Sequence, residues 1–274
     1  MTSAGGDIIQ LKRLEHSGEK YDIDSQENIE EMNRVRCAFL FLLIFAAFVN
    51  AQNPSAKFYS QASSFLGKYV HEGRVNYAAI KKYPRAMQEI ITTLADFDLK
   101  SLIGANAEKA FWINAYNLLV ISSVVSRYPV KSPLDVSGFF DRAKHRVAGD
   151  SLTLNEIENN KLRKKLNDAR IHFTLVCAAK GCPTLLNRAY HSESLDEQLD
   201  SRARATLNDA AYVRVNSGAR KILLSEIFRW YEADFASGGR TVIDYMNQYR
   251  TEKIQIDFSI DLIPYDWTLN ASSE

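Results

Sequence analysis

The chain has 274 residues, of which 46% are hydrophobic and 24% are charged, and its formal net charge is +1. A near-neutral chain without a basic stripe is not expected to bind nucleic acid. No repeat or low-complexity tract interrupts the roughly 220 residues that follow residue 51, and this length is enough for one domain with its own core.

The N-terminal region has the pattern of an export signal. A short basic segment at 32–36 precedes an apolar run at 38–49, and Ala51 supplies a small residue for cleavage. The apolar run is shorter than the ~20 residues of a membrane span. We predict an over-extended, disordered N-terminus over 1–31, a signal peptide over 32–51 and an extracytoplasmic (periplasmic or secreted) domain over 52–274. The alternative is an uncleaved signal anchor, and only that alternative would make the membrane a partner.

Apolar spacing and capping residues predict a mostly helical domain. Helices are predicted over 55–70, 84–94, 106–127, 153–166, 194–207, 225–235 and 241–249. The helix over 106–127 is apolar nearly all round, which is typical of a helix in the middle of a core. Aromatic residues at helical spacing in 225–235 are likewise expected in the core.

The predicted strands are short. They are expected at 75–77, in a hairpin over 146–153, at 172–177, in a second hairpin of 212–215 with 221–224, and at 254–256 and 260–263. Turn residues such as Gly149-Asp150 and Ser217-Gly218 separate the strands of the two hairpins. The fold class that follows is α+β, a mostly helical single domain with a small, largely antiparallel sheet.

Two cysteines, Cys177 and Cys182, follow the predicted cleavage point. The sequence Gly181-Cys182-Pro183 is typical of a turn that enters a helix, with Pro183 at the first helical position. The positive end of a helix favours a thiolate, so this environment suits a nucleophilic cysteine. In an oxidising compartment the same two residues are expected to form a disulfide. The sequence leaves both interpretations open.

Several blocks of the chain, in order, resemble one known family. The segment FWINAYN at 111–117 is similar to a signature of the family named domain of unknown function 547. Further blocks resemble this family: YPV at 128–130, LNEIENNKLR at 154–163 and RIHF at 170–173. Three more resemble its bacterial form: Cys177 with GCP at 181–183, LSEIFRWYEADF at 224–235 and PYDWTLN at 264–270. The resemblance covers about residues 58–270 and implies a fold and a domain boundary, but no agreed reaction.

An enzyme of this sequence would use Cys182 as its nucleophile, with His172 and His191 as the candidate bases. On a straight strand His172 and Cys177 point to opposite faces, which argues against a direct pair of these two residues. Asn114 and Asn117 share one face of the helix over 106–127. Either amide is a candidate for orienting a catalytic histidine, but we expect them to bond the backbone and fix helix packing.

Two classes of function therefore stay open. The leading one is a binding or scaffold domain with Cys177–Cys182 as a structural disulfide and an unknown peptide, cell-wall or protein ligand. The alternative is a cysteine-dependent hydrolase or acyltransferase that acts on amide bonds. Weaker alternatives are a thiol redox pair and a metal site on His172, both cysteines and His191, whose spacing matches no standard zinc motif. We expect no cofactor and no metal.

Overall fold

The computed structural model describes residues 32–34, 36 and 54–272. The chain divides into two units, Met1–Asn53 and Pro54–Glu274. The predicted N-terminal extension and most of the predicted signal peptide lie outside the described residues, so the account below concerns the second unit. Among the described residues, no helix has both the length and the apolar character that a membrane crossing requires.

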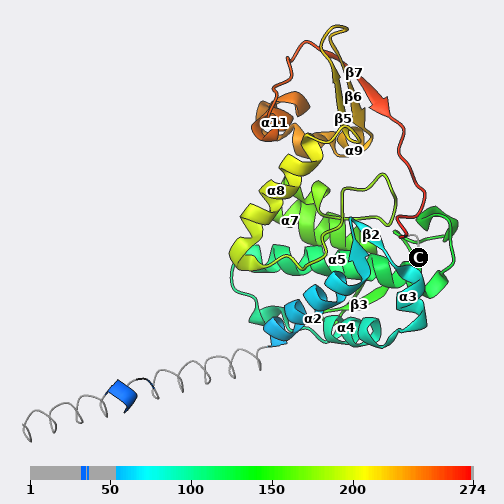
Figure 1. Ribbon diagram of the computed structural model, residues 1–274, viewed down its shortest axis with the longest axis vertical. Helices are drawn as coiled ribbons and strands as arrows, with labels where there is room; N and C mark the ends of the chain where they lie inside the picture. Colours follow the sequence, from blue (N-terminus) through cyan, green and yellow to red (C-terminus); the bar gives the residue numbers. More distant parts are fainter. Residues whose placement is uncertain (1–31, 35, 37–53, 273–274) are drawn as a thin grey trace, which may run out of the picture. The chain divides into compact units, whose positions relative to one another are not determined.

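Helices make up most of the second unit (Figure 1). The longer ones are α2 (Pro54–Tyr69), α4 (Arg85–Ala95), α5 (Ala105–Arg127), α8 (Leu195–Leu207) and α11 (Val242–Tyr249). The shorter α-helices are α3 (Tyr77–Lys82), α6 (Leu154–Glu156), α7 (Lys164–Leu166), α9 (Ile227–Trp230) and α10 (Glu232–Phe235). Single turns of 3₁₀-helix occur at η1 (Leu99–Ser101), η2 (Pro133–Asp135), η4 (Ala169–Phe173), η5 (Ser192–Ser194) and η6 (Ser237–Gly239), and η3 (Ile157–Arg163) is a π-helix. All five longer helices were predicted from the sequence to within a residue or two at each end.

The strands form three small sheets. Two are antiparallel hairpins, β1 (Val70–His71) with β2 (Arg74–Val75) and β3 (His145–Val147) with β4 (Asp150–Leu152). The third has the order β5 (Val213–Asn216), β6 (Lys221–Ser225) and β7 (Ser259–Ile263). The β5–β6 pair is antiparallel, and β7 joins β6 in parallel. The mostly helical α+β class and the two predicted hairpins are confirmed, whereas the parallel pairing of β7 was not predicted.

The buried apolar side chains form two cores. The first surrounds α5, whose Trp112, Ile113 and Leu118 are fully buried, and includes the inner faces of α2, α3 and α4. The second lies among β5, β6, α8 and α11, around Phe235. Figure 1 shows the three-stranded sheet and α11 at one end of the unit, α2 to α5 at the other, and α8 running between them.

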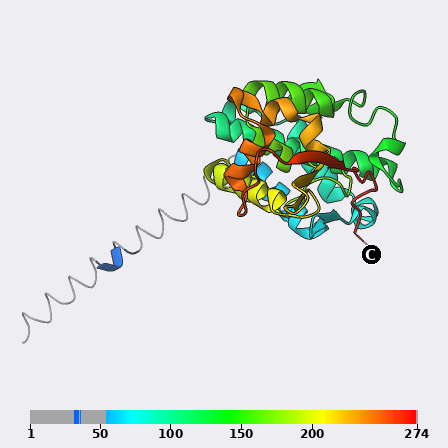
Figure 2. The same ribbon diagram turned by 90° about the horizontal axis from the view of Figure 1, so that it is seen from above.

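The C-terminal strap, residues 264–272, links the two ends. Figures 1 and 2 show this red segment leaving β7 and crossing to the end of the unit that contains α2 to α5. Its Tyr265 packs against both cores. Near its end, the strap bonds the first hairpin: the Val75 N–H donates to the Asn270 carbonyl at 3.0 Å, and the Ser272 N–H donates to the Val75 carbonyl at 3.0 Å.

Two predictions around the cysteines are wrong. The segment 172–177 is not a strand, because the chain forms the 3₁₀-helix η4 as far as Phe173 and has no regular structure from 175 to 177. Asp168 starts this turn by accepting the Arg170 N–H at 3.1 Å. A short apolar run that is buried on all sides does not distinguish a strand from a helix. No helix begins at Pro183 either, and the next helical turn is η5.

Candidate ligand-binding site

A pocket of about 310 Å³ lies where the two cores meet. Six aromatic side chains contribute to its lining: Tyr116, Phe140, Trp230, Tyr231, Tyr265 and Trp267. Glu158, His172 and Cys177 add the polar and sulfur-containing part of the wall. These residues come from α5, η3, η4, α9 and the C-terminal strap, so folding brings together segments that are far apart in the sequence. We call this site the aromatic pocket.

Glu158 is the acidic residue of the aromatic pocket. Its helix begins at a capping box, in which Thr153 accepts the Glu156 N–H at 3.1 Å and Glu156 accepts the Thr153 N–H at 2.7 Å. The helix then widens into the π-helix η3, which holds Glu158 at 7% exposure. Burial, together with the charge of Glu158 and a hydrogen bond to it, raises the pKa of both Tyr116 and Tyr231. Single π-helical turns inside α-helices are frequent at functional sites.

His172 is held in a fixed orientation beside the aromatic pocket. Its Nε2 lies 2.7 Å from Asp234 Oδ2, and its ring stacks on Tyr231 with centroids 3.8 Å apart. Arg163 binds the same carboxylate with two bonds, Nε to Oδ2 at 2.7 Å and Nη2 to Oδ1 at 3.1 Å. Hydrogen bonds from His172 and Arg163 outweigh burial and hold the pKa of Asp234 well below its usual range. The histidine therefore has an ionised partner at ordinary pH.

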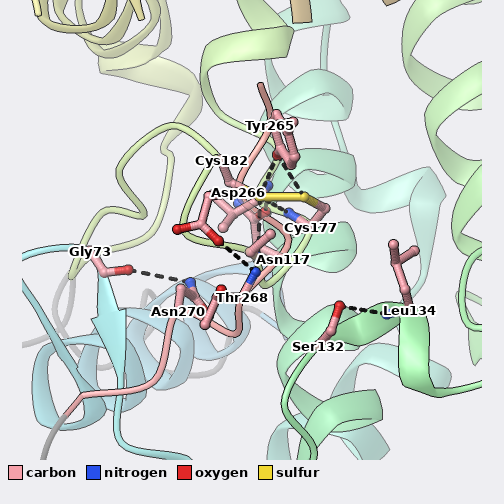
Figure 3. Close-up of a disulfide and its surroundings, with 12 residues drawn as sticks. Gly73, Asn117, Ser132, Leu134, Cys177, Cys182, Tyr265, Asp266, Thr268 and Asn270 are labelled. Carbon is pink, nitrogen blue, oxygen red and sulfur yellow. Dashed lines mark hydrogen bonds between the residues drawn. A yellow bond between two sulfur atoms is a disulfide. The ribbon is translucent and has the colours of Figure 1, made fainter. Parts of the chain in front are cut away.

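Cys177 and Cys182 form a disulfide with their Cα atoms 6.2 Å apart. The loop they close pairs with the C-terminal strap: the Lys180 N–H donates to the Thr268 carbonyl and the Gly181 N–H to the Asp266 carbonyl, each at 2.8 Å. Figure 3 shows the disulfide beside Tyr265 and Asp266 of the strap. A Cβ at Gly181 would come within 3.0 Å of the Asp266 nitrogen and the Tyr265 ring, so the two segments are in close contact. The disulfide loop and the strap thus support each other at the edge of the aromatic pocket.

The two sulfur atoms have different surroundings. Cys177 is half-buried and lines the aromatic pocket, and its Sγ lies 3.0 Å from the Tyr265 hydroxyl. Cys182 is 5% exposed and does not line that pocket. Its Sγ accepts hydrogen bonds from the Cys177 N–H at 3.0 Å, the Ala179 N–H at 3.4 Å and the Tyr265 hydroxyl at 3.1 Å. Cys177 is therefore the sulfur that a molecule in the pocket would meet.

The structure brings together only some of the residues singled out from the sequence. His172 and Cys177 line the same pocket, although a straight strand would have put them on opposite faces. The 3₁₀ turn at η4 changes the direction of the chain between them, which the sequence argument did not include. Cys182, proposed as the nucleophile, lies on the other side of the disulfide loop and lines a smaller hollow of about 110 Å³.

Asn114 and Asn117 bond the backbone of neighbouring loops. Asn114 donates to the Tyr190 carbonyl at 2.8 Å and accepts the Tyr190 N–H at 2.9 Å. Asn117 makes the same kind of double contact, to the Thr174 carbonyl and the Val176 N–H, each at 2.9 Å. The two amides thereby fix the chain before and after the disulfide loop onto α5. Within the described part of the chain, neither is hydrogen-bonded to a histidine.

Sequence reasoning missed most of the aromatic pocket. Glu158 and Asp234 were not candidates, and Trp230 was assigned to the core, whereas it is 39% exposed and lines the pocket. The prediction of buried aromatics holds for Phe228 and Phe235 on the same segment. One signal was available, because 227–235 carries acidic residues among aromatic ones. Across the described residues, no group of three or more His, Cys, Asp or Glu side chains is placed to hold a metal ion.

The region 100–206 matches the model of one protein family, DUF547, described as a protein of unknown function. It contains α5, η3, η4 and the disulfide loop, and hence Tyr116, Glu158, His172 and both cysteines. Trp230, Asp234 and the C-terminal strap lie beyond it. No curated protein and no solved structure matches the chain. The chain is therefore similar to the DUF547 family over residues 100–206.

Proposed function

We propose that this domain acts outside the cytoplasm and binds a small ligand in the aromatic pocket. The observation that carries the proposal is the pocket itself, about 310 Å³ with six aromatic side chains and one buried carboxylate in its lining. Small-molecule sites are typically concave and apolar, with a few polar groups that set the orientation of the ligand. A domain that only served as a scaffold would have no need for such a cavity.

The disulfide serves this function by holding one wall of the pocket. In the chain-entropy picture, closing so small a loop stabilises the folded state by about 2 kcal/mol. Its larger contribution is local, because the loop it closes is hydrogen-bonded to the strap that carries Tyr265 and Trp267. A persistent disulfide also agrees with the export signal predicted at 32–51, since disulfides persist in oxidising compartments.

A fragment screen by ligand-observed NMR tests the proposed function. The variant Trp230→Ala removes a half-exposed ring from the pocket wall, and Tyr83→Ala removes an exposed ring, at 59% exposure, that does not line the pocket. We expect fragments that bind the wild-type protein, fail to bind Trp230→Ala and still bind Tyr83→Ala. A screen that finds no fragment with this pattern contradicts the proposal.

A cysteine-dependent hydrolase or acyltransferase is the second candidate. It is favoured by one observation: Cys177 and His172 line the same pocket, and Asp234 orients His172. This arrangement makes Cys177, rather than Cys182, the nucleophile, and it requires a reduced disulfide. After reduction, iodoacetamide is then expected to alkylate Cys177 faster than Cys182, with the rate at Cys177 lowered in Asp234→Asn. Equal rates at the two thiols would remove this candidate.

A further inference from the structure

We propose that the ligand of the aromatic pocket is an organic cation that carries an alkylammonium group, with Glu158 as its counter-charge. This inference rests on the proposed ligand-binding function and specifies the class of ligand.

The lining of the aromatic pocket has an excess of negative charge. Among the described residues, Glu158 is the only carboxylate in it, and no lysine or arginine contributes to it. The nearby Arg163 is engaged elsewhere, since its guanidinium holds both oxygens of Asp234 and the Asn159 side chain. Within the described residues Glu158 has no ion-pair partner within 4.0 Å: the hydroxyls of Tyr116 and Tyr231 bond it, and the Arg163 guanidinium acts on it only from a greater distance. A buried carboxylate that no cation contacts directly favours a positively charged ligand and disfavours an anionic one.

The rings around this carboxylate suit a cation. Trp230, Tyr265 and Trp267 form a group with centroids 4.8 to 5.8 Å apart and interplanar angles of 32° to 56°, so their planes are inclined to one another. The face of an aromatic ring carries negative electrostatic potential, and inclined rings offer such faces from several sides. A cation that lies over an exposed face of this ring group, such as that of the 39% exposed Trp230, is attracted to it.

A sugar ligand is a poorer fit to the same wall. Stacking on a tryptophan would suit a sugar ring, but its many hydroxyl groups need several donors and acceptors. Among the described residues, the lining adds to Glu158 and His172 only the Asn155 amide, the indole N–H groups of Trp230 and Trp267, and tyrosine hydroxyls that already bond Glu158 or the cysteine sulfurs. An alkylammonium group needs only the carboxylate and the ring faces, both of which are present.

The test compares cations with neutral molecules of the same shape. Tetramethylammonium and choline are titrated into the disulfide-intact protein, alongside neopentane-like neutral alcohols such as 3,3-dimethylbutan-1-ol, the neutral isostere of choline. Tryptophan fluorescence reports binding, because Trp230 and Trp267 line the pocket. We expect choline to bind at least about tenfold more tightly than its neutral isostere, the size of effect that one close charge pair in a desolvated site supplies.

Three variants locate the effect. Glu158→Gln keeps the shape of the side chain and is expected to reduce the preference for choline to about twofold or less. Glu197→Gln removes the same charge from an exposed position on α8 outside the pocket and should leave the preference intact. Trp230→Leu keeps an apolar, half-exposed side chain, which protects folding, and should weaken choline binding several-fold while changing binding of the neutral isostere less.

The outcomes separate this inference from the proposed function. Equal affinity for choline and its isostere overturns the cation inference and leaves a ligand-binding pocket. The cation inference also fails if no cation binds while the fragment screen yields Trp230-dependent ligands. If circular dichroism shows that Glu158→Gln is unfolded, the test uses Trp230→Leu instead. An unchanged preference for choline over its isostere in Trp230→Leu then contradicts the inference. Only a screen without any Trp230-dependent fragment removes the proposed function itself.

Discussion

Two carboxylates of this domain, Asp168 and Asp234, have nearly the same chemistry and different surroundings. Asp168 is bound by Lys109 at 2.7 Å and by Arg170 at 2.8 Å, and Arg170 also reaches Asp196 and Asp200. Asp234 is bound by Arg163 and His172. Both have lowered pKa values. The first cluster joins α5, η4 and α8 and does not line the aromatic pocket, whereas the second stands directly behind a pocket wall.

The comparison teaches that burial and ion pairing alone do not mark a functional site. Perturbed pKa values occur at structural ion-pair networks as well as at active sites. What distinguishes Asp234 is that its partner His172 and its neighbour Tyr231 line a cavity. The Asp168 cluster is therefore a structural joint, and the Asp234 cluster is a support for the aromatic pocket. The predictions that follow test this division.

The largest effect is expected from Asp168→Ala, which breaks the structural joint. Lys109 has a side chain only 9% exposed and would lose its carboxylate, and an unpaired buried charge costs several kcal/mol. We expect the free energy of unfolding, measured by urea denaturation, to fall by about 3 kcal/mol. Asp150→Ala, which breaks the exposed pair with Lys161, is the control and should cost less than about 1 kcal/mol. A similar small loss in both variants would contradict the structural role.

The second prediction concerns how the free energy of unfolding changes with pH below pH 5. Burial alone would raise the pKa of Asp168, but hydrogen bonds from Arg170 and Lys109 outweigh it and lower the pKa to about 2. A carboxyl with a lowered folded-state pKa stabilises the fold above its unfolded pKa of about 4, and this contribution is lost as pH falls toward the folded value. We expect the difference in unfolding free energy between wild type and Asp168→Asn to shrink by about 2 kcal/mol from pH 5 to pH 2. A difference that stays constant over that range would be the contrary result.

A smaller loss of stability is expected from Asp234→Asn, which weakens the support of the pocket. The side chain of Asp234 is 26% exposed, so water replaces part of what the substitution removes. We expect urea denaturation to show a fall of about 1.5 kcal/mol, the value of one hydrogen bond to a charged group. The same substitution should also change fragment binding in the aromatic pocket, since His172 loses its fixed partner. A variant that loses as much stability as Asp168→Ala, with unchanged binding, would reverse the assignment of the two clusters.

The sequence predicts the elements whose signals are local. Apolar spacing locates α2, α4, α5 and α8, and the structure shows that a capping box of Thr241 and Asp244 starts α11. The apolar run 171–177 gave a wrong strand prediction. Because the run is buried on all sides, its residues do not alternate between a buried and an exposed face, and this alternation is what identifies a strand. The helix break at Tyr231 and the π-helix η3 depend on packing with distant segments. The residues around them carry no local signal that predicts either feature.

The aromatic pocket is largely beyond sequence reasoning for the same reason. Cys177 and His172 attract attention because their side chains are chemically distinctive. Glu158, Trp230 and Trp267 lie in blocks that resemble the family, but they form one site only when η3, α9 and the C-terminal strap come together. His172 and Cys177 were predicted to point to opposite faces because a strand was expected at 172–177. That prediction is wrong, because the chain forms the 3₁₀-helix η4 as far as Phe173 instead.

Fragment binding to two variants tests most directly whether the aromatic pocket, and not the Asp168 cluster, is the functional site. The fragment library is screened at pH 7 against Trp230→Ala and Asp168→Asn, each shown to be folded by circular dichroism. The account predicts that Trp230→Ala loses the fragments bound by wild type and that Asp168→Asn keeps them at unchanged affinity, despite its lower stability. Fragments retained by Trp230→Ala, or lost equally in both variants, would contradict it.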